Sequence, residues 1–288
     1  MAINGMPIDF PKVQAWKVRS IDGYFGGVVG DLLAVSTVSG AYVFDAQSAD
    51  FTFADPEVLE VIDGGLRKLQ INVSNRPTNA FVIGDADLDY DLFVMTTDSA
   101  VDVTNVKYKR FQHSSERVDL PPMGLCISQR YYDASAAPGA AFQYVHTIFP
   151  LTQIAPARTG ATQRQHSVTN YRVTPFPVTK DLTGMAFSAS VKMKPYNSKL
   201  DCYALIAPKP IHIAVYKVAD TLAPTFKLPF LPLTTTVTVG DTTNELWRNG
   251  VQEAATSVNI TTGNVIAAIG AANDILVVIY TTDFVPSP

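Results

Sequence analysis

Residues 234–280 read TTTVTVGDTTNELWRNGVQEAATSVNITTGNVIAAIGAANDILVVIY. Short apolar and β-branched runs alternate here with Gly, Asn and Asp, a pattern typical of strands joined by tight turns. Asn249-Gly250 suits a type I′ hairpin turn between strands at 245–248 and 251–254. Further strands are expected at residues 234–239, 258–261, 265–269 and 275–281. Strands at this spacing predict a sandwich or a barrel.

The rest of the chain follows the same pattern. Strands are expected within residues 32–44, 69–73, 80–83, 92–97, 101–111, 124–132, 142–149, 168–178, 186–194 and 202–218. Residues 134–141 (ASAAPGAA) and 156–166 (PARTGATQRQH) are predicted loops, because they lack large apolar residues. The apolar, Pro-rich segment 224–232 connects to the last section. We therefore expect a mainly β chain, with a β domain over residues 1–223 and a β-rich section over 224–288.

One short helix is expected at residues 55–63, flanking the β core. Asp55 suits an N-cap, and Pro56 suits the first helical position, where its missing N–H costs nothing. The apolar residues at 58, 59, 61 and 62 would form one side of the helix, and Gly64-Gly65 would end it.

The composition excludes a disordered chain, because 47% of its 288 residues are apolar and 17% are charged. No apolar run is long enough to span a bilayer, and residues 1–10 have no secretion-signal pattern. We expect a soluble chain made in a cytoplasm, without membrane insertion. The net charge of −4 is unevenly placed: residues 1–157 carry −7, residues 158–227 carry +7 and residues 228–288 carry −4. Such blocks suit a subunit that contacts copies of itself.

Groups that could carry catalysis are sparse. The chain has no G-x-S-x-G, H-E-x-x-H or Walker A pattern, so no catalytic residue, metal or cofactor is assigned. Its two cysteines, Cys126 and Cys202, are expected to be buried free thiols. Of the four histidines, His146 and His212 lie in β-like runs and are expected to be core or face residues with hydrogen-bond partners.

Four carboxylates recur at every second residue: Asp85, Asp87, Asp89 and Asp91. An EF-hand calcium loop has similar spacing but needs Gly and Glu where this chain has Tyr90 and Thr96. In a strand, all four would share one face, and that face must meet water or basic partners. The segment is either a solvated strand or turn, or a functional acidic surface, which would repel nucleic acid.

Three segments resemble phage structural proteins. DPEVLEVIDGG (55–65) and SVTNYRVTPFPVTKDLTGMAFS (167–188) are similar to stretches of tail tube (major tail) proteins of tailed bacteriophages, and residues 234–280 resemble small β modules of phage virions. The resemblance implies a β-sandwich with one flanking helix. It also implies subunits in rings, usually hexameric, whose inner strands form one barrel with an acidic lumen. An arm from each subunit would reach the next ring.

On this resemblance we expect a virion protein that stacks into a tail tube through which DNA passes without specific binding. The helix would be residues 55–63, and the arm would be 156–166, with Arg158, Arg164 and His166. The Asp85–Asp91 face is a candidate lumen stripe. Sheath, tape-measure and tail-terminator proteins are the implied partners, and assembly would occur in the host cytoplasm. The alternatives are another phage structural role, such as capsid decoration, a β-sandwich that binds carbohydrate or a receptor, and an enzyme, which no spacing supports.

Overall fold

The computed structural model contains twenty strands and no helix in the residues that it describes. The described residues are 6–7, 12–17, 42–51, 57–63, 66–73, 80–85, 100–102, 110–112, 122–132, 142–160, 168–176, 178, 181, 183, 203–218, 222–241 and 244–288. The strands are β1 (Met6–Pro7), β2 (Lys12–Lys17), β3 (Tyr42–Phe51), β4 (Glu57–Asp63), β5 (Leu66–Val73), β6 (Phe81–Asp85), β7 (Ala100–Asp102), β8 (Arg110–Gln112), β9 (Pro122–Tyr132), β10 (Phe142–Gly160), β11 (Val168–Pro175), β12 (Tyr203–Ala207), β13 (Ile211–Lys217), β14 (Thr225–Lys227), β15 (Phe230–Pro232), β16 (Glu245–Arg248), β17 (Val251–Glu253), β18 (Ser257–Val258), β19 (Asn264–Ile266) and β20 (Ile275–Pro286). The prediction of a mainly β chain is confirmed.

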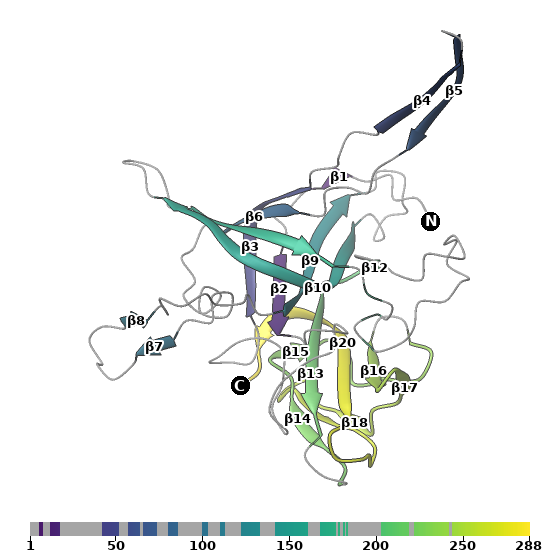
Figure 1. The fold of residues 1–288 in the computed structure, drawn as a ribbon. Helices are drawn as coiled ribbons and strands as arrows, with labels where there is room; N and C mark the ends of the chain where they lie inside the picture. The colour runs from purple at the N-terminus through teal and green to yellow at the C-terminus, as the bar shows by residue number, and fades with distance from the viewer. Residues whose placement is uncertain are drawn as a thin grey trace.

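Eight strands form the largest sheet, and six of them pair in a closed circuit (Figure 1). Around the circuit β9 pairs with β2, β2 with β3, β3 with β6, β6 with β11, β11 with β10, and β10 with β9, always antiparallel. β1 adds to β9 and β12 adds to β10 outside the circuit. β-Bulges in β3 and β10 bend these strands, which helps the sheet to curve round on itself.

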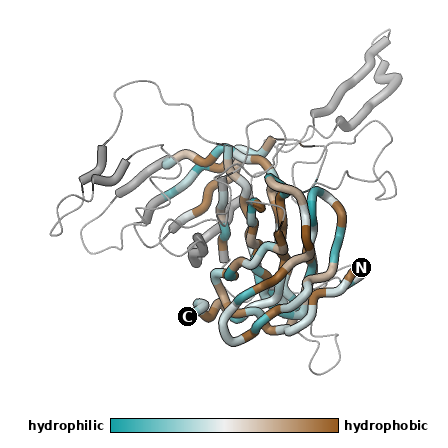
Figure 2. Tube along the Cα trace, turned by 90° about the horizontal axis from the view of Figure 1, so that it is seen from below, coloured by the Kyte–Doolittle hydropathy of each residue, from teal (hydrophilic) through white to brown (hydrophobic). Residues whose placement is uncertain are grey.

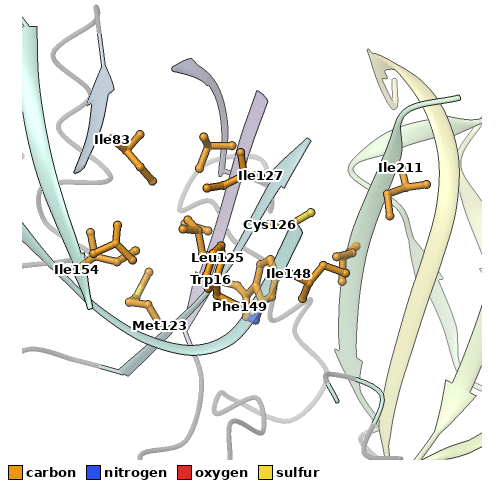
Figure 3. Packing of buried hydrophobic residues seen from close by; sticks show 14 of the residues in the cluster. Trp16, Ile83, Met123, Leu125, Cys126, Ile127, Ile148, Phe149, Ile154 and Ile211 are labelled. Carbon is orange, nitrogen blue, oxygen red and sulfur yellow. The ribbon is translucent and has the colours of Figure 1, made fainter. Parts of the chain in front are cut away.

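The main hydrophobic core lies on one face of this circuit. Strand alternation gives a shared side to residues from five strands: Val13, Ala15, Phe81, Ile83, Leu125, Ile127, Phe149, Ile154, Tyr171 and Val173, all of them buried. The ring centroids of Phe81 and Phe149 are 4.9 Å apart. Figure 3 shows Ile83, Leu125, Ile127 and Ile154 around a common space. Figure 2 shows apolar (brown) and polar (teal) positions alternating along the described strands.

The other face of the circuit packs on a second sheet, of order β13-β20-β16-β17 with β15 paired to β20. Cys126 and Ile148 lie on this side, towards Ile211 of β13 (Figure 3). β13 divides its side chains between two cores, because Ile213 packs with the main core while Ala214 packs with a second cluster. That second cluster also takes residues from the three-stranded sheet β14-β19-β18.

Gln14 of β2 joins the two sheets through its side-chain amide. Its Nε2 donates to the carbonyl of Ile211 at 2.8 Å, and its Oε1 accepts from the amide of Ile213 at 3.2 Å. Gln14 is buried. The amide therefore supplies the two hydrogen bonds that a neighbouring strand would make with the outer edge of β13, as buried backbone groups require.

The C-terminal hairpin has the predicted turn. Asn249 and Gly250 both have positive φ, 49° and 86°, which a type I′ turn requires. They join β16 to β17, with Arg248 opposite Val251. The strand predicted at residues 234–239 is wrong, since none forms there. Thr234 instead makes local hydrogen bonds with the amide and carbonyl of Thr236, which compete with a strand ladder.

The helix predicted at residues 55–63 is also wrong. Residues 57–63 form β4, which pairs with β5 from Glu57↔Val73 to Asp63↔Leu66. The register shifts between Val61 and Ile62, and this irregularity breaks strand alternation in a way that imitates helical spacing in the sequence. The β-branched residues of the segment favour a strand, and Gly64-Gly65 suits a hairpin as well as a helix end.

Candidate functional site

The predicted acidic stripe falls only partly on described residues. Asp85 is the last residue of β6, where it pairs with Ala46 of β3 and Thr169 of β11. Asp87, Asp89 and Asp91 lie outside the described residues. The stripe therefore stays a prediction, with its first member fixed at the end of one strand of the circuit.

The segment predicted as a loop and candidate arm, residues 156–166, is in part a strand. Residues 156–160 are not a loop, because they continue β10 and pair with β11. Arg158 lies opposite Asn170, just after a register shift that follows Pro156. Proline lacks an N–H for the ladder and is tolerated in a strand at such a bulge. Arg164 and His166 lie outside the described residues.

An exposed cluster of aromatic rings around one arginine lies where β9 ends and β10 begins. We call Arg130, Tyr132, Phe142 and Tyr144 the hairpin aromatic cluster. Tyr132 and Phe142 are opposite each other, 40% and 41% exposed, with ring centroids 5.3 Å apart. The Arg130 guanidinium carbon lies 4.1 Å from the Phe142 ring centroid and 6.0 Å from that of Tyr144. This surface can stack on a planar or sugar ring and offers a cation beside it.

The hairpin aromatic cluster was missed from the sequence, although its signal is present. RYY (130–132) and FQY (142–144) flank the predicted loop 134–141, and both runs were predicted as strands. Only the register Tyr132↔Phe142 and Arg130↔Tyr144 places the four residues on one face. The cluster could be found only by knowing that these two strands pair, and in which register, because the composition of either run does not reveal it.

A buried polar group lies further along the same two strands. Ser128 Oγ and His146 Nδ1 are 2.7 Å apart, and Cys126 Sγ lies 3.8 Å from Ser128 Oγ. Burial lowers the pKa of His146 to about 4, opposed by a hydrogen bond with the Lys209 backbone. Burial raises the pKa of Cys126 to about 12, opposed by Ser128. All three side chains are buried, which confirms the predictions of a buried free thiol at Cys126 and of a core histidine with a hydrogen-bond partner at His146.

His212 differs from the prediction made for it. It is fully buried, but neither of its ring nitrogens has a hydrogen-bond partner among the described residues. Cys202 and the other two histidines, His113 and His166, lie outside the described residues. An unpaired buried polar group costs free energy, so its presence in a core calls for an explanation.

Arg248 is the centre of an ionic network in the C-terminal section. Its Nε and Nη2 donate to the two carboxylate oxygens of Glu253 at 2.8 and 2.9 Å, and Nη1 donates to Asp274 at 3.1 Å. Asn249 Nδ2 donates to the other Asp274 oxygen at 2.7 Å. Burial raises the pKa of Asp274, but bonds from the Ala271 amide, Asn249 and Arg248 outweigh it, so the pKa is lowered overall.

We expect Arg248→Met to lower the free energy of unfolding by about 2–3 kcal/mol, because it leaves two half-buried carboxylates without their cation. Urea unfolding followed by circular dichroism measures the loss. Arg172→Met is the matched control, since Arg172 is exposed on β11, and its loss should stay within about 0.5 kcal/mol. Equal losses in the two variants would contradict a structural role for the network.

Within the described residues, no three His, Cys, Asp or Glu side chains gather closely enough to hold a metal ion. The described part of the chain also contains no helix long and apolar enough to cross a membrane. The chain matches no protein-family model, and no curated protein is significantly similar to it in sequence.

Proposed function

We propose that this protein is a structural subunit that assembles into stacked rings, the tail tube of a bacteriophage. The observation that carries the proposal is the β4–β5 hairpin. Its strands of 7 and 8 residues pair with each other and with no other described strand, and Figure 1 shows the hairpin standing away from the large sheet. A lone two-stranded hairpin is marginally stable in water, so it needs a surface to pack on. A neighbouring subunit supplies one.

The hairpin takes the place of residues 156–166 as the main arm in this proposal. Part of that segment is already committed to β10, whereas the β4–β5 hairpin is a separate unit. The closed circuit of β9, β2, β3, β6, β11 and β10 serves as the sandwich or barrel core of the tube subunit. Its two outer strands, β1 and β12, each pair on one side only with described strands, and such edges are where neighbouring subunits of one ring would pair.

The mechanism is physical and not catalytic. Identical subunits, about six to a ring, pair their edges laterally, and the arm makes a heterologous contact that repeats along one axis. The Asp85–Asp91 stripe would line the lumen and repel the DNA phosphates, so that DNA slides without binding. Sheath, tape-measure and tail-terminator proteins would be its partners, and the virion tail its location after assembly in the host cytoplasm.

The hairpin aromatic cluster favours a second candidate function, a carbohydrate- or receptor-binding module. Tyr132 and Phe142 offer adjacent exposed rings, and Arg130 lies beside them with a hydrogen-bonding cation. Sugar binding on such a surface would not require assembly. A glycan array with the wild-type chain and with Phe142→Ala distinguishes this function from the tube.

Negative-stain electron microscopy of the purified full chain tests the tube proposal. We expect rings or tubes with a central channel, and a chain in which a short Gly-Ser linker replaces residues 57–73 should stay folded but monomeric. The matched control replaces the other isolated hairpin, residues 100–112, in the same way. A wild-type chain that stays monomeric at high concentration contradicts the proposal, and rings formed without β4–β5 contradict the role of the arm.

A further inference from the structure

His212, near the start of β13, sits in a cage of aromatic rings on the second sheet. Its ring centroid lies 5.0 Å from that of Phe230 on β15, 5.4 Å from Tyr280 and 6.2 Å from Phe284, both on β20. Each ring meets the imidazole edge to face. The histidine is fully buried, and among the described residues neither nitrogen finds a partner. Phenylalanine would fill this position without that cost, so the imidazole is the feature to explain.

One wall of the cage is built by the end of β20, which pairs with β15 at Pro232↔Thr282 and Phe230↔Pro286, and by the two residues that follow. We call residues 282–288 the terminal strap. Four of its seven residues are exposed, and Phe284 is a half-buried residue that covers His212. Phe284 has a φ of 57°, a left-handed conformation that is unfavourable for a phenylalanine. The strap is therefore strained at Phe284, and it is fixed by the buried Thr282 while four of its side chains are exposed.

Hydrogen bonds tie the strap to β15 and to the residue before β13. The Thr282 amide donates to the Pro210 carbonyl at 3.0 Å, and Thr282 Oγ1 donates to the Leu231 carbonyl at 2.8 Å. The Phe284 amide donates to Thr282 Oγ1 at 3.0 Å, and the Ser287 amide donates to the Pro229 carbonyl at 2.9 Å. Local opening of such an exposed segment costs much less than global unfolding.

We propose that His212 is an acid-sensitive latch, which holds the terminal strap closed while its imidazole is neutral and releases the strap when the imidazole is protonated. A charged imidazolium cannot stay unpaired in an apolar cage without a large cost. The ring faces offer some cation–π attraction, but this is weaker than the loss of hydration. Opening the strap lets water reach the ring and removes the cost.

Among the described residues, the groups that face His212 supply no counter-charge within the cage. From β20 the titratable group against it is Tyr280, whose hydroxyl accepts a hydrogen bond from the Phe230 amide, and burial raises the pKa of Tyr280. Asp283 on the strap is exposed. β15 reads FLP and has no titratable side chain. On β13 itself the charged residue is Lys217, five positions away.

The direction of the pH effect follows from proton binding. Burial lowers the pKa of His212 from 6.5 to about 3. The closed strap therefore binds fewer protons than the open strap between these values. Acid favours the open form, whose population rises by up to about tenfold for each pH unit below 6.5. Above pH 6.5 the latch has no pH dependence.

Hydrogen exchange followed by mass spectrometry on the full chain, between pH 7.5 and 4.5, tests the latch. After correction for the intrinsic exchange rate, we expect protection of residues 282–288 to fall by up to about 100-fold from pH 6.5 to 4.5. Residues 275–279 should keep their protection, which separates local opening from unfolding. In His212→Phe the strap should show no such loss. His146→Gln, which removes a second buried histidine of the described residues, should show the same acid-induced loss of strap protection as the wild type.

A second measurement in the unmodified chain does not depend on any variant folding. The ring-proton NMR signals of His212 should titrate over the pH range in which the strap loses protection. Strap protection that is flat from pH 7.5 to 4.5 would overturn the latch, as would equal acid sensitivity in His212→Phe or a His212 titration uncoupled from strap exchange. The latch is a property of the single subunit, so these results stand whether or not the chain forms tubes.

Discussion

Replacing Gln14 with leucine is expected to lower the free energy of unfolding by about 2–5 kcal/mol, because two buried backbone groups lose their partner at once. Leucine fits the apolar surroundings of the side chain but cannot pair with the carbonyl of Ile211 or the amide of Ile213. Each group pays its own desolvation penalty, since both lie in the interface between the two sheets. The loss is measured by equilibrium urea unfolding.

Gln14→Glu separates the two bonds. A glutamate at position 14 retains an acceptor for the backbone N–H of Ile213. Its second carboxylate oxygen, however, faces the Ile211 carbonyl oxygen, to which the glutamine Nε2 donates in the wild type. We expect this variant to be at least as destabilised at pH 7 as Gln14→Leu, and to recover part of the loss on acidification. Gln153→Leu is the matched control, because Gln153 is exposed on β10. If Gln14→Leu is as stable as the control, the amide bridge has no structural importance.

Gly124→Ala should be comparably damaging, for a steric reason. A Cβ at this position would lie 2.0 Å from Nε1 of Trp16, which is 1% exposed and packed directly across from it. The indole is held between the sheets, so it cannot move aside without disturbing the core. We expect a loss of about 3 kcal/mol or more in urea unfolding.

A double-mutant cycle makes this prediction specific. Trp16→Leu alone should cost about 3 kcal/mol through the cavity that it leaves. In the Trp16→Leu background the alanine at 124 has room, so the two losses should sum to clearly more than the loss of the double variant. Gly240→Ala gives the contrast: nothing lies within 4 Å, and only its φ of 88° opposes the change, so about 1 kcal/mol is expected. Additive losses at 16 and 124 would rule out the steric explanation.

Local features of the fold could be predicted from the sequence, whereas pairings could not. Asn249-Gly250 specifies its turn because positive φ at both positions is a property of those two residues. Residues 57–63 were misjudged because the irregularity at Val61–Ile62 depends on the partner strand β5, which local spacing does not reveal. The closed circuit depends on pairings such as β3 with β6, and no local pattern encodes them.

The candidate sites show the same division. The buried thiol of Cys126 followed from its residue type and surroundings. The hairpin aromatic cluster depended on a register between two runs, and the lack of partners around His212 depended on rings from β15 and β20. A property that depends on one residue and its local run can be predicted from the sequence. A site built from residues on several strands can be recognised only once the strand pairing is known.

The amide bridge of Gln14 has a consequence for synthesis on the ribosome. Gln14 and Ile211 are 197 residues apart, and β13 in turn pairs with β20, the last of the described strands to be translated. Translation therefore delivers β2 long before the edge that it caps, and the second sheet cannot form until β20 has left the exit tunnel. Nascent chains keep the interface between the sheets open until that point. The order of synthesis itself delays completion of this part of the fold, and with it any encounter between folded copies, until β20 has been translated.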